Sequence, residues 1–284
     1  MEPKILVFGE ILFDIFNNKA EIGGAPFNFA AHFVSLGGKA DLISAVGDDD
    51  LGKQALEEVE KRGIGQQFIT ENTFKTGYCQ VTLDNGTPSY DLVLGVAYDY
   101  IETPAVTEEY DALYFGTLAQ RGMDSRQSLY MLLGRPWKEV FYDVNVRAPH
   151  YSQGTIEKSI ARATILKISR EEASVLFPYT TPEEYCKKVL ETYPNLKEVV
   201  LTLDKDGAMT YNRKSGAVYG PTPTGEVVST VGAGDSFGAC YLYHRLKGHP
   251  IKRCLEAANT LAGHVVSHLG AVPDLPEELK KQLQ

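Results

Sequence analysis

Residues Ser229-Thr230-Val231-Gly232-Ala233-Gly234-Asp235-Ser236-Phe237 decide how this chain is interpreted. Apolar side chains recur at helical spacing over residues 236–248, so Gly232 to Asp235 predict the start of a helix. Two glycines in this stretch let the backbone turn several N–H groups toward one point and approach a ligand closely. Free N–H groups and the helix dipole make such a helix start attractive to anions.

Asp235 adds a carboxylate to this anion-binding helix start. A carboxylate repels phosphate, unless it accepts a proton from a nucleophile that attacks the phosphate. An anion site beside a general base is the minimum equipment for phosphoryl transfer. Asp is also a good helix N-cap, and an ordinary cap explains this stretch equally well when the stretch is taken alone.

The composition excludes several classes of protein. The chain has 284 residues, of which 43% are hydrophobic and 23% charged, as in a soluble globular protein with one extended or two smaller α/β domains. The formal net charge of -9 argues against a nucleic-acid partner, which would need a basic face. No segment resembles a signal peptide or reaches membrane-spanning length, so we expect a cytoplasmic protein without membrane association.

The cysteines and histidines give no metal motif. The four cysteines lack C-x-x-C spacing, so neither a metal site nor a disulfide framework is indicated. His264 and His268 lie four residues apart on an expected helix, but no third ligand accompanies them, and we expect exposed or core-edge histidines.

Short apolar runs alternate with helical stretches along most of the chain. The strand-like runs are residues 4–8, 40–46, 112–115, 139–143, 164–168 and 199–203. Helical stretches are expected near 26–36, 50–62, 124–133, 153–162, 182–192, 236–248 and 250–270. This alternation predicts an α/β fold with a doubly wound, mostly parallel sheet and helices on both faces.

Residues 76–95 depart from this rhythm. Polar and apolar side chains alternate there, and Asn85-Gly86 predicts a type I′ hairpin turn. We expect this hairpin to lie outside the main sheet and to form a small β-sheet with residues near 11–22.

Polar residues follow several of the expected strands. Asp14, residues 143–147 and residues 167–172 lie just beyond strand ends, where doubly wound folds bind their ligands. The stretch Gly23-Gly24-Ala25-Pro26-Phe27-Asn28 is a second glycine-rich helix start, with Pro26 suited to the first turn. We expect Asn28 to face the same ligand-binding region. Taken alone, however, Asn28 is explained as a second helix cap.

Two motifs together resemble the signatures of the ribokinase-like (PfkB) carbohydrate kinase family. Residues 23–28, with Leu36-Gly37 and residues 47–52, resemble its N-terminal signature, and residues 230–237 resemble its C-terminal one. The resemblance covers nearly the whole chain. Four further stretches are most similar to bacterial fructokinases, namely Gly9-Glu10 with Asp14, residues 97–99, 116–121 and 143–147.

The resemblance implies roles for residues around the sugar. Asp235 matches the base that takes a proton from the sugar's primary hydroxyl. The other matches are the anion hole for the transferring phosphoryl group (Gly232, Ala233, Gly234) and the groups that bind the sugar (Asp14, Gly24, Asn28). The family resemblance also implies one domain over 1–284, with a β lid formed from about 11–22 and 76–100. Closing a lid excludes water from the reaction.

The resemblance also implies a nucleotide groove and cofactors. Residues expected along the groove are Lys167, Thr202, Gly207 and Asn259. Ser169 and Glu172 stand where the family has an N-x-x-E motif, near the phosphates and the water shell of Mg²⁺. Ser229 stands where the family usually has an Asp tied to a monovalent-cation site, so dependence on K⁺ is left open.

The implied activity is an ATP-dependent sugar kinase that transfers the γ-phosphoryl group to a hydroxyl of a hexose, with fructose as the first candidate. Ketodeoxygluconate kinase is the alternative, because Arg147 could pair with a substrate carboxylate. A sugar-binding regulator without catalysis is a third reading, against which Asp235 and the anion hole argue. The expected partners are a small-molecule sugar and ATP, and a homodimer is left open.

Overall fold

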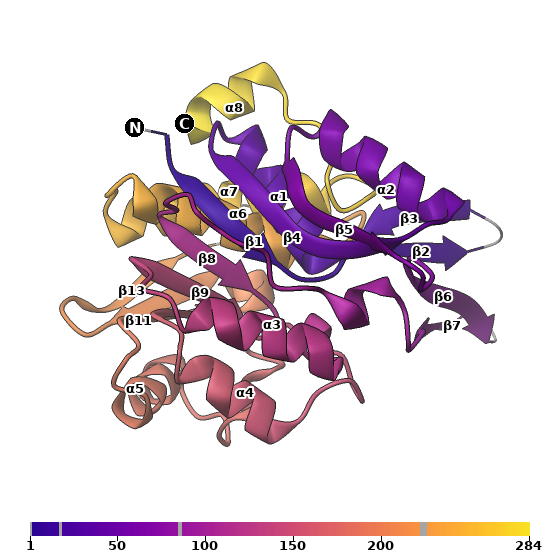
Figure 1. The fold of residues 1–284 in the computed structure, drawn as a ribbon. Coiled ribbons are helices and arrows are strands. Elements are labelled where there is room, and N and C mark those ends of the chain that lie inside the picture. The colour runs from indigo at the N-terminus through magenta and orange to yellow at the C-terminus, as the bar shows by residue number, and fades with distance from the viewer. Residues whose placement is uncertain (1, 17–18, 85–86, 222–225) are drawn as a thin grey trace.

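A mostly parallel sheet forms the centre of the molecule (Figure 1). The computed structural model describes residues 2–16, 19–84, 87–221 and 226–284. Within them, the strands of the main sheet are β1 (Lys4–Phe8), β4 (Lys39–Gly47), β5 (Gly65–Asn72), β8 (Ala112–Phe115), β9 (Glu139–Asp143), β10 (Ile165–Ser169), β11 (Glu198–Thr202), β12 (Ala208–Asn212) and β13 (Gly216–Gly220). Their spatial order is β13-β12-β11-β10-β9-β8-β1-β4-β5. Only the β11–β12 and β12–β13 pairs among them are antiparallel.

Strand β1 shows why these apolar runs become central strands. Its side chains are buried on both faces of the sheet: Leu6 and Phe8 belong to one core cluster, and Ile5 and Val7 to the other. A parallel strand covered by helices on both faces needs a continuous run of apolar residues, which residues 5–8 supply.

Helices cover both faces of the sheet (Figure 1). On one face lie α3 (Met123–Leu133), α4 (Gln153–Ile160) and α5 (Pro182–Thr192), and on the other α1 (Ala25–Ser35), α2 (Asp50–Lys61), α6 (Ala233–Leu246) and α7 (Ile251–Val266). The short helix α8 (Glu277–Leu283) ends the chain near the N-terminus. The predicted fold class, a doubly wound α/β sheet, is confirmed.

Several boundaries differ from the predictions. Strands β5, β12 and β13 were not predicted, and each is partly exposed, so its sequence lacks a continuous apolar run. Helix α6 begins at Ala233, within the helix start predicted at Gly232 to Asp235. Helix α7 ends at Val266 rather than 270.

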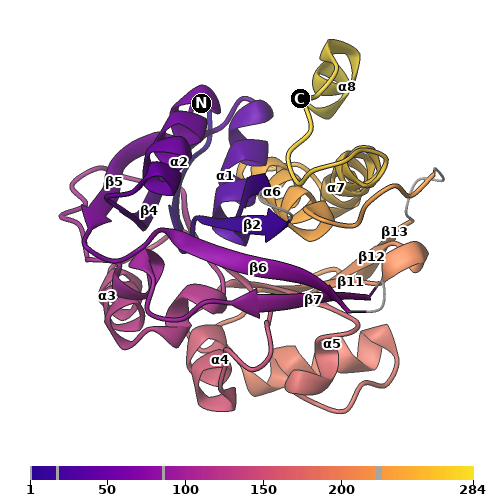
Figure 2. The ribbon, with the colours of Figure 1, turned by 90° about the vertical axis from the view of Figure 1, so that its right-hand side faces the viewer.

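A second, four-stranded sheet confirms the small sheet predicted outside the main one (Figure 2). We call it the lid sheet; its strands are β2 (Leu12–Phe16), β3 (Lys19–Gly23), β6 (Gly77–Asp84) and β7 (Thr87–Leu92), in the order β3-β2-β6-β7. The predicted turn at Asn85-Gly86 lies outside the described residues.

A buried ion pair fixes the end of β7 to the core. Arg121 Nε lies 2.7 Å from Asp99 Oδ1, and the two side chains are only 5% and 7% exposed. The Arg121 guanidinium also donates to the carbonyl oxygens of Leu92 and Val93. Asp99 in turn accepts the backbone N–H of Gly95 at 2.9 Å. This buried ion pair and its additional hydrogen bonds fix the point at which the chain passes from β7 of the lid sheet to the rest of the fold.

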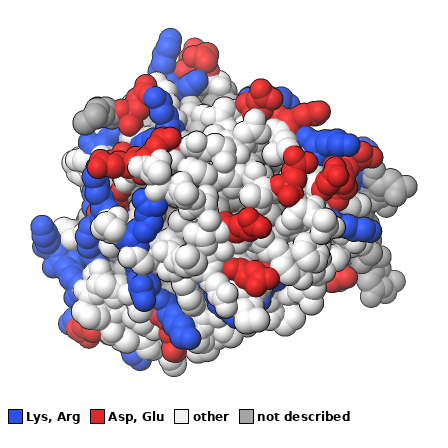
Figure 3. All heavy atoms as spheres, viewed as in Figure 1, with Lys and Arg blue, Asp and Glu red and all other residues white. Residues whose placement is uncertain are grey.

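No helix in the described ranges combines the length and the apolar character that crossing a bilayer requires. On the face shown in Figure 3, acidic and basic side chains are mixed, and its centre is mostly uncharged with some acidic side chains.

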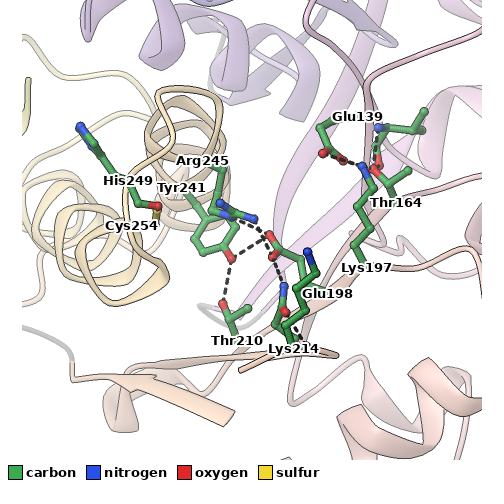
Figure 4. Close-up of polar contacts among 12 residues, drawn as sticks. Glu139, Thr164, Lys197, Glu198, Thr210, Lys214, Tyr241, Arg245, His249 and Cys254 are labelled. Atoms are coloured by element: carbon green, nitrogen blue, oxygen red, sulfur yellow. Dashed lines mark hydrogen bonds and ion pairs between the residues drawn. The ribbon is translucent and has the colours of Figure 1, made fainter. Parts of the chain in front are cut away.

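A second buried charge cluster ties α6 to the sheet (Figure 4). Glu198 on β11 is fully buried, and Arg245 donates to both of its carboxylate oxygens at 3.0 and 3.1 Å. Tyr241 Oη and Asn212 Nδ2 donate to the same carboxylate at 3.0 and 2.9 Å. Arg245 and Tyr241 lie on α6, so this cluster holds the helix whose first turn carries Asp235.

We predict that Glu198→Gln lowers the free energy of unfolding by about 3–5 kcal/mol, because it leaves the Arg245 guanidinium without its buried counter-charge. The matched control is Lys197→Gln, which breaks the neighbouring ion pair with Glu139 at 2.7 Å, where Lys197 is 53% exposed. That control should lose no more than about 1 kcal/mol. Chemical denaturation of both variants measures the difference, and equal losses would show that the Glu198 cluster adds no special stability.

Candidate functional site

The glycine-rich helix start has the backbone that the sequence predicts. Gly232 is the N-cap of α6 and adopts φ +79°, a left-handed conformation that favours glycine. A Cβ atom at Gly232 would lie 2.3 Å from the carbonyl oxygen of Ala271, so the backbone there has no room for a side chain. The N–H groups of the first helical turn therefore follow a tightly packed glycine, and that of Ala233 donates to the Thr230 carbonyl oxygen at 3.3 Å.

Asp235 lies in that first turn and is oriented by Asn28 of α1. Asn28 Nδ2 donates to Asp235 Oδ2 at 2.8 Å, and the two residues are 5% and 9% exposed. Burial raises the pKa of Asp235, although the Asn28 hydrogen bond and the charges of Lys167 and Arg147 oppose the change. A carboxylate with a raised pKa and one fixed oxygen is a stronger base than a solvated one, and its other oxygen remains for a substrate.

The second glycine-rich stretch places Asp14 and Asn28 on the same side of the site. Gly24, the N-cap of α1, has φ +102°, and a Cβ there would lie 2.5 Å from the backbone oxygen of Glu10. Asp14 on β2 lies beside Gly23, whose Cβ would be 3.8 Å from Asp14 Oδ2. Burial and the nearby Glu21 raise the pKa of Asp14, and Arg147 opposes them. Strand β2 of the lid sheet therefore places the Asp14 carboxylate next to the start of α1.

Arg147 and Glu10 lie between these two groups of residues. The positive charge of Arg147 lowers the pKa of Asp14, Asp235 and Glu10, so Arg147 is close enough to act on all three carboxylates. Glu10 follows β1 and is 3% exposed, and its Oε2 atom has no hydrogen-bond partner among the described residues. Burial raises the pKa of Glu10 to about 7. In the sequence, Glu10 stands out only as part of the Gly9-Glu10 stretch that resembles fructokinases, since nothing local reveals that it is buried.

A groove of about 510 Å³ lies beside the start of α6. Most of the predicted site residues line it: Arg147, Lys167, Ser169, Glu172, Thr202, Gly207, Ala233, Gly234 and Asn259. Val227, Ala262 and Val266 add apolar side chains to its wall, which suits a flat heterocycle. The remaining predicted residues do not line the groove; they are Asp14, Gly24, Asn28, Gly232 and Asp235. The Asn28–Asp235 hydrogen bond connects α1 to the first turn of α6.

Lys167 lies beneath the helix start as well as along the groove. Its Nζ contacts both oxygens of Asp143, at 2.9 and 2.8 Å, and would lie 3.3 Å from a Cβ on Gly234. Asp143 and Lys167 are paired residues of the neighbouring strands β9 and β10. Burial lowers the pKa of Lys167, but the attraction of Asp143 and other carboxylates outweighs it, and the pKa lies above its ordinary value. The lysine therefore keeps its positive charge under the anion-binding backbone.

Glu172 is held by hydrogen bonds before any ligand arrives. Its oxygens accept the backbone N–H groups of Val146 and Ser169, both at 2.9 Å, and the Ser169 hydroxyl at 2.9 Å. No group of three or more potential metal-ligating side chains occurs in the described parts of the chain. A carboxylate has about four acceptor positions, so Glu172 can still accept from a metal-bound water.

Asn259 and Gly207 shape the groove through the backbone. Asn259 Nδ2 donates to the carbonyl oxygens of Gly220 and Pro221, at 2.7 and 3.0 Å, so its amide nitrogen already has two acceptors. Gly207 adopts φ +91° after the short turn at Asp204, which is itself at φ +54°. Gly207 and Asn259 thus both line the groove. The side chain of Asn259 also holds the end of β13 through its two hydrogen bonds.

The whole sequence was compared with known proteins. It is 28% identical to an ATP-dependent 6-phosphofructokinase of Thermoanaerobacterium thermosaccharolyticum, over 96% of this chain and 91% of the relative. It is 26% identical to a 5-dehydro-2-deoxygluconokinase of Geobacillus thermodenitrificans, over 87% of this chain and 78% of the relative.

The fold and the family agree with these relatives. A crystal structure of fructokinase with bound ATP from Xylella fastidiosa superposes with a TM-score of 0.87, covering 100% of this chain and 98% of that one, at 20% identity. At this identity the similarity shows the fold. The family model described as pfkB family carbohydrate kinase matches residues 2–278, and the chain therefore belongs to the pfkB family of carbohydrate kinases.

Proposed function

We propose that this carbohydrate kinase transfers the γ-phosphoryl group of ATP to a hydroxyl of a neutral hexose, with fructose as the first candidate. The observation that carries the proposal is the Asn28–Asp235 hydrogen bond, which places an oriented, buried carboxylate in the first turn of α6. The ATP-sized groove meets the same turn from one side, and Asp14 and Gly24 approach Asn28 from the other.

Each part of the site supplies one element of phosphoryl transfer. Asp235 accepts the proton of the attacking hydroxyl while Asn28 holds its other oxygen. We assign the N–H groups of Gly232, Ala233 and Gly234 to the charge that develops on the transferring group, where preorganised donors act most strongly. The Ala233 N–H also donates to the Thr230 carbonyl oxygen at 3.3 Å. Lys167, charged and buried beneath them, adds a fixed positive potential at the same place.

The residues around Ser169 and Glu172 fit a magnesium ion held indirectly. Mg²⁺ keeps most of its waters and binds through phosphates with few protein ligands, so a single carboxylate with free acceptor positions is sufficient. Bound there, the ion would neutralise phosphate charge. We assign Glu172 and Ser169 to its water shell. Ser229, with its backbone N–H bonded to Val266 oxygen at 3.1 Å, offers no carboxylate to a monovalent cation.

The charges on the sugar side favour a neutral substrate. Arg147 is exposed, and its positive charge favours the ionised form of the Glu10, Asp14 and Asp235 carboxylates. Glu21 adds a further negative charge next to Asp14. A sugar acid or a sugar phosphate would have to enter beside these carboxylates, with Arg147 as its counter-charge. The sugar-acid alternative nevertheless has a partner in Arg147, and the relatives named above include kinases for charged substrates.

We predict that Asp235→Asn lowers kcat by about 10²–10⁴-fold, because the amide keeps the shape and the bond from Asn28 but cannot accept a proton. Sugar and ATP binding should remain close to those of the parent. A coupled assay of ADP release measures kcat, and calorimetry measures binding. Turnover close to that of the parent would remove Asp235 from the role of base.

Asp14→Ala should raise the KM for the sugar about 10- to 100-fold with little change in the KM for ATP, since a charged hydrogen bond contributes roughly 1.5–3 kcal/mol. Glu21→Ala is the matched control, because Glu21 is paired with Asp14 across β2 and β3 and is exposed. The control should change KM by less than about threefold. A larger effect of Asp14→Ala on ATP than on sugar would reverse the assignment of the two sides.

Arg147→Ala separates the candidate substrates. With a neutral ketohexose, we expect the variant to lower kcat more than it weakens sugar binding, because Arg147 then orders the surrounding carboxylates. With ketodeoxygluconate or fructose 6-phosphate as the true substrate, losing the charge partner should raise KM at least about 10-fold. Parent and variant are compared on fructose, fructose 6-phosphate and ketodeoxygluconate. Higher parent activity on a charged substrate, lost with the arginine, would replace the neutral-sugar proposal.

A further inference from the structure

The backbone at Gly232 is seated on a segment that carries no helix or strand. Residues 267–275, between α7 and α8, pass behind the start of α6. Ala271 in this segment meets Gly232 so closely that a Cβ on the glycine would lie 2.7 Å from the Ala271 Cα and 2.3 Å from its oxygen. The position of Gly232 therefore depends on the position of Ala271.

A buried histidine fixes that position. His32 Nε2 lies 2.9 Å from the carbonyl oxygen of Ala271, and His32 is 0% exposed. A carbonyl oxygen only accepts, so the ring donates from Nε2 and Nδ1 carries no proton. His32 Nδ1 has no hydrogen-bond partner in the described part of the chain. Burying an imidazole ring that makes a single hydrogen bond costs free energy. We therefore expect the hydrogen bond to the Ala271 carbonyl oxygen to have a structural role.

The surroundings keep the ring neutral. Burial lowers the pKa of His32 to about 4, and the charges of Arg62 from α2 and His264 from α7 lower it further, while the bond to Ala271 opposes them. The Nε2–H donor is thus present throughout the neutral range of pH. Asp274, which follows in the same segment, lies 3.5 Å from Arg62 and accepts from His264 through its backbone oxygen.

His32 and Asn28 share one face of α1. They lie four residues apart, one helical turn, and side chains at this spacing are neighbours. Asn28 orients the carboxylate of Asp235, and His32 holds the segment on which Gly232 rests. One helix face thereby contacts both the base and the support of the anion-binding backbone.

We propose that His32 is a positioning residue for phosphoryl transfer, which acts through the Ala271 carbonyl to hold the Gly232 backbone where the transferring group needs it. This inference rests on the proposed role of the α6 start. If Asp235→Asn retained full turnover, the proposed function would fail whatever His32 does, so the two failures are distinguishable.

The test compares His32→Leu, which fills the space without a donor, with His32→Gln, whose amide can donate to the same carbonyl. We expect His32→Leu to lower kcat per folded enzyme by about 10–100-fold, because small displacements of catalytic groups and lost anion-hole donors have effects of this size. The KM values for sugar and ATP should stay within about threefold, and His32→Gln should recover most of the rate.

A second readout does not depend on turnover. ADP with aluminium fluoride and sugar mimics the transferring phosphoryl group, and its binding should weaken about 10-fold in His32→Leu while ADP alone binds normally. His264→Leu is the control, because His264 contacts the same segment at Asp274 and is not in the groove. Its kcat should match that of the parent.

Three outcomes would overturn the proposal. One is a kcat of His32→Leu within about twofold of the parent per folded molecule, which is far from the loss expected for a displaced anion hole. Another is an equal loss in His32→Gln, which would point to packing rather than the donor. The third is an equal loss in His264→Leu. If His32→Leu does not fold, His32→Met, with a flexible apolar side chain, replaces it in the same comparison.

Discussion

The hydrogen bond from Asn28 to Asp235 joins two helix starts that are 207 residues apart in the sequence. Each helix begins at a glycine with a positive φ, Gly24 in α1 and Gly232 in α6. Neither glycine could be exchanged without a collision with backbone atoms of Glu10 or Ala271. The site thus depends on two close backbone approaches, and the side-chain bond between them sets their relative position.

The rest of the fold keeps α6 from moving relative to the sheet. Glu198 binds Arg245 and Tyr241 near the far end of the helix, as Figure 4 shows. Lys167 and Asp143 form their pair beneath its near end. Buried charged pairs are costly to form, but they tolerate few alternative arrangements once formed. Here both occur along the helix that carries Asp235, the proposed base, for which a fixed geometry matters most.

The sequence predicted the buried strands and both glycine-rich helix starts, because these features have local signals. Residues 5–8 are apolar at every position, and residues 230–237 carry their glycines and Asp235 side by side. The partly exposed strands β5, β12 and β13 gave no such run. The Asp143–Lys167 pair depends on the register of β9 and β10, and the role of His32 depends on a segment more than 230 residues away. Contacts of this kind exist only after the chain has folded, so no spacing in the sequence reveals them.

The Arg121–Asp99 pair has a consequence for how such enzymes can diversify. It fastens the chain at Leu92 and Val93, at the end of β7. Strands β6 and β7 therefore extend outward from a clamp that does not depend on their length. Exchanging them for longer or shorter strands would reshape the lid sheet without disturbing the clamp, because the entropic cost of a longer connection grows slowly. The outer part of the lid sheet is thus a replaceable module, and the helix starts at Gly24 and Gly232 lie outside it.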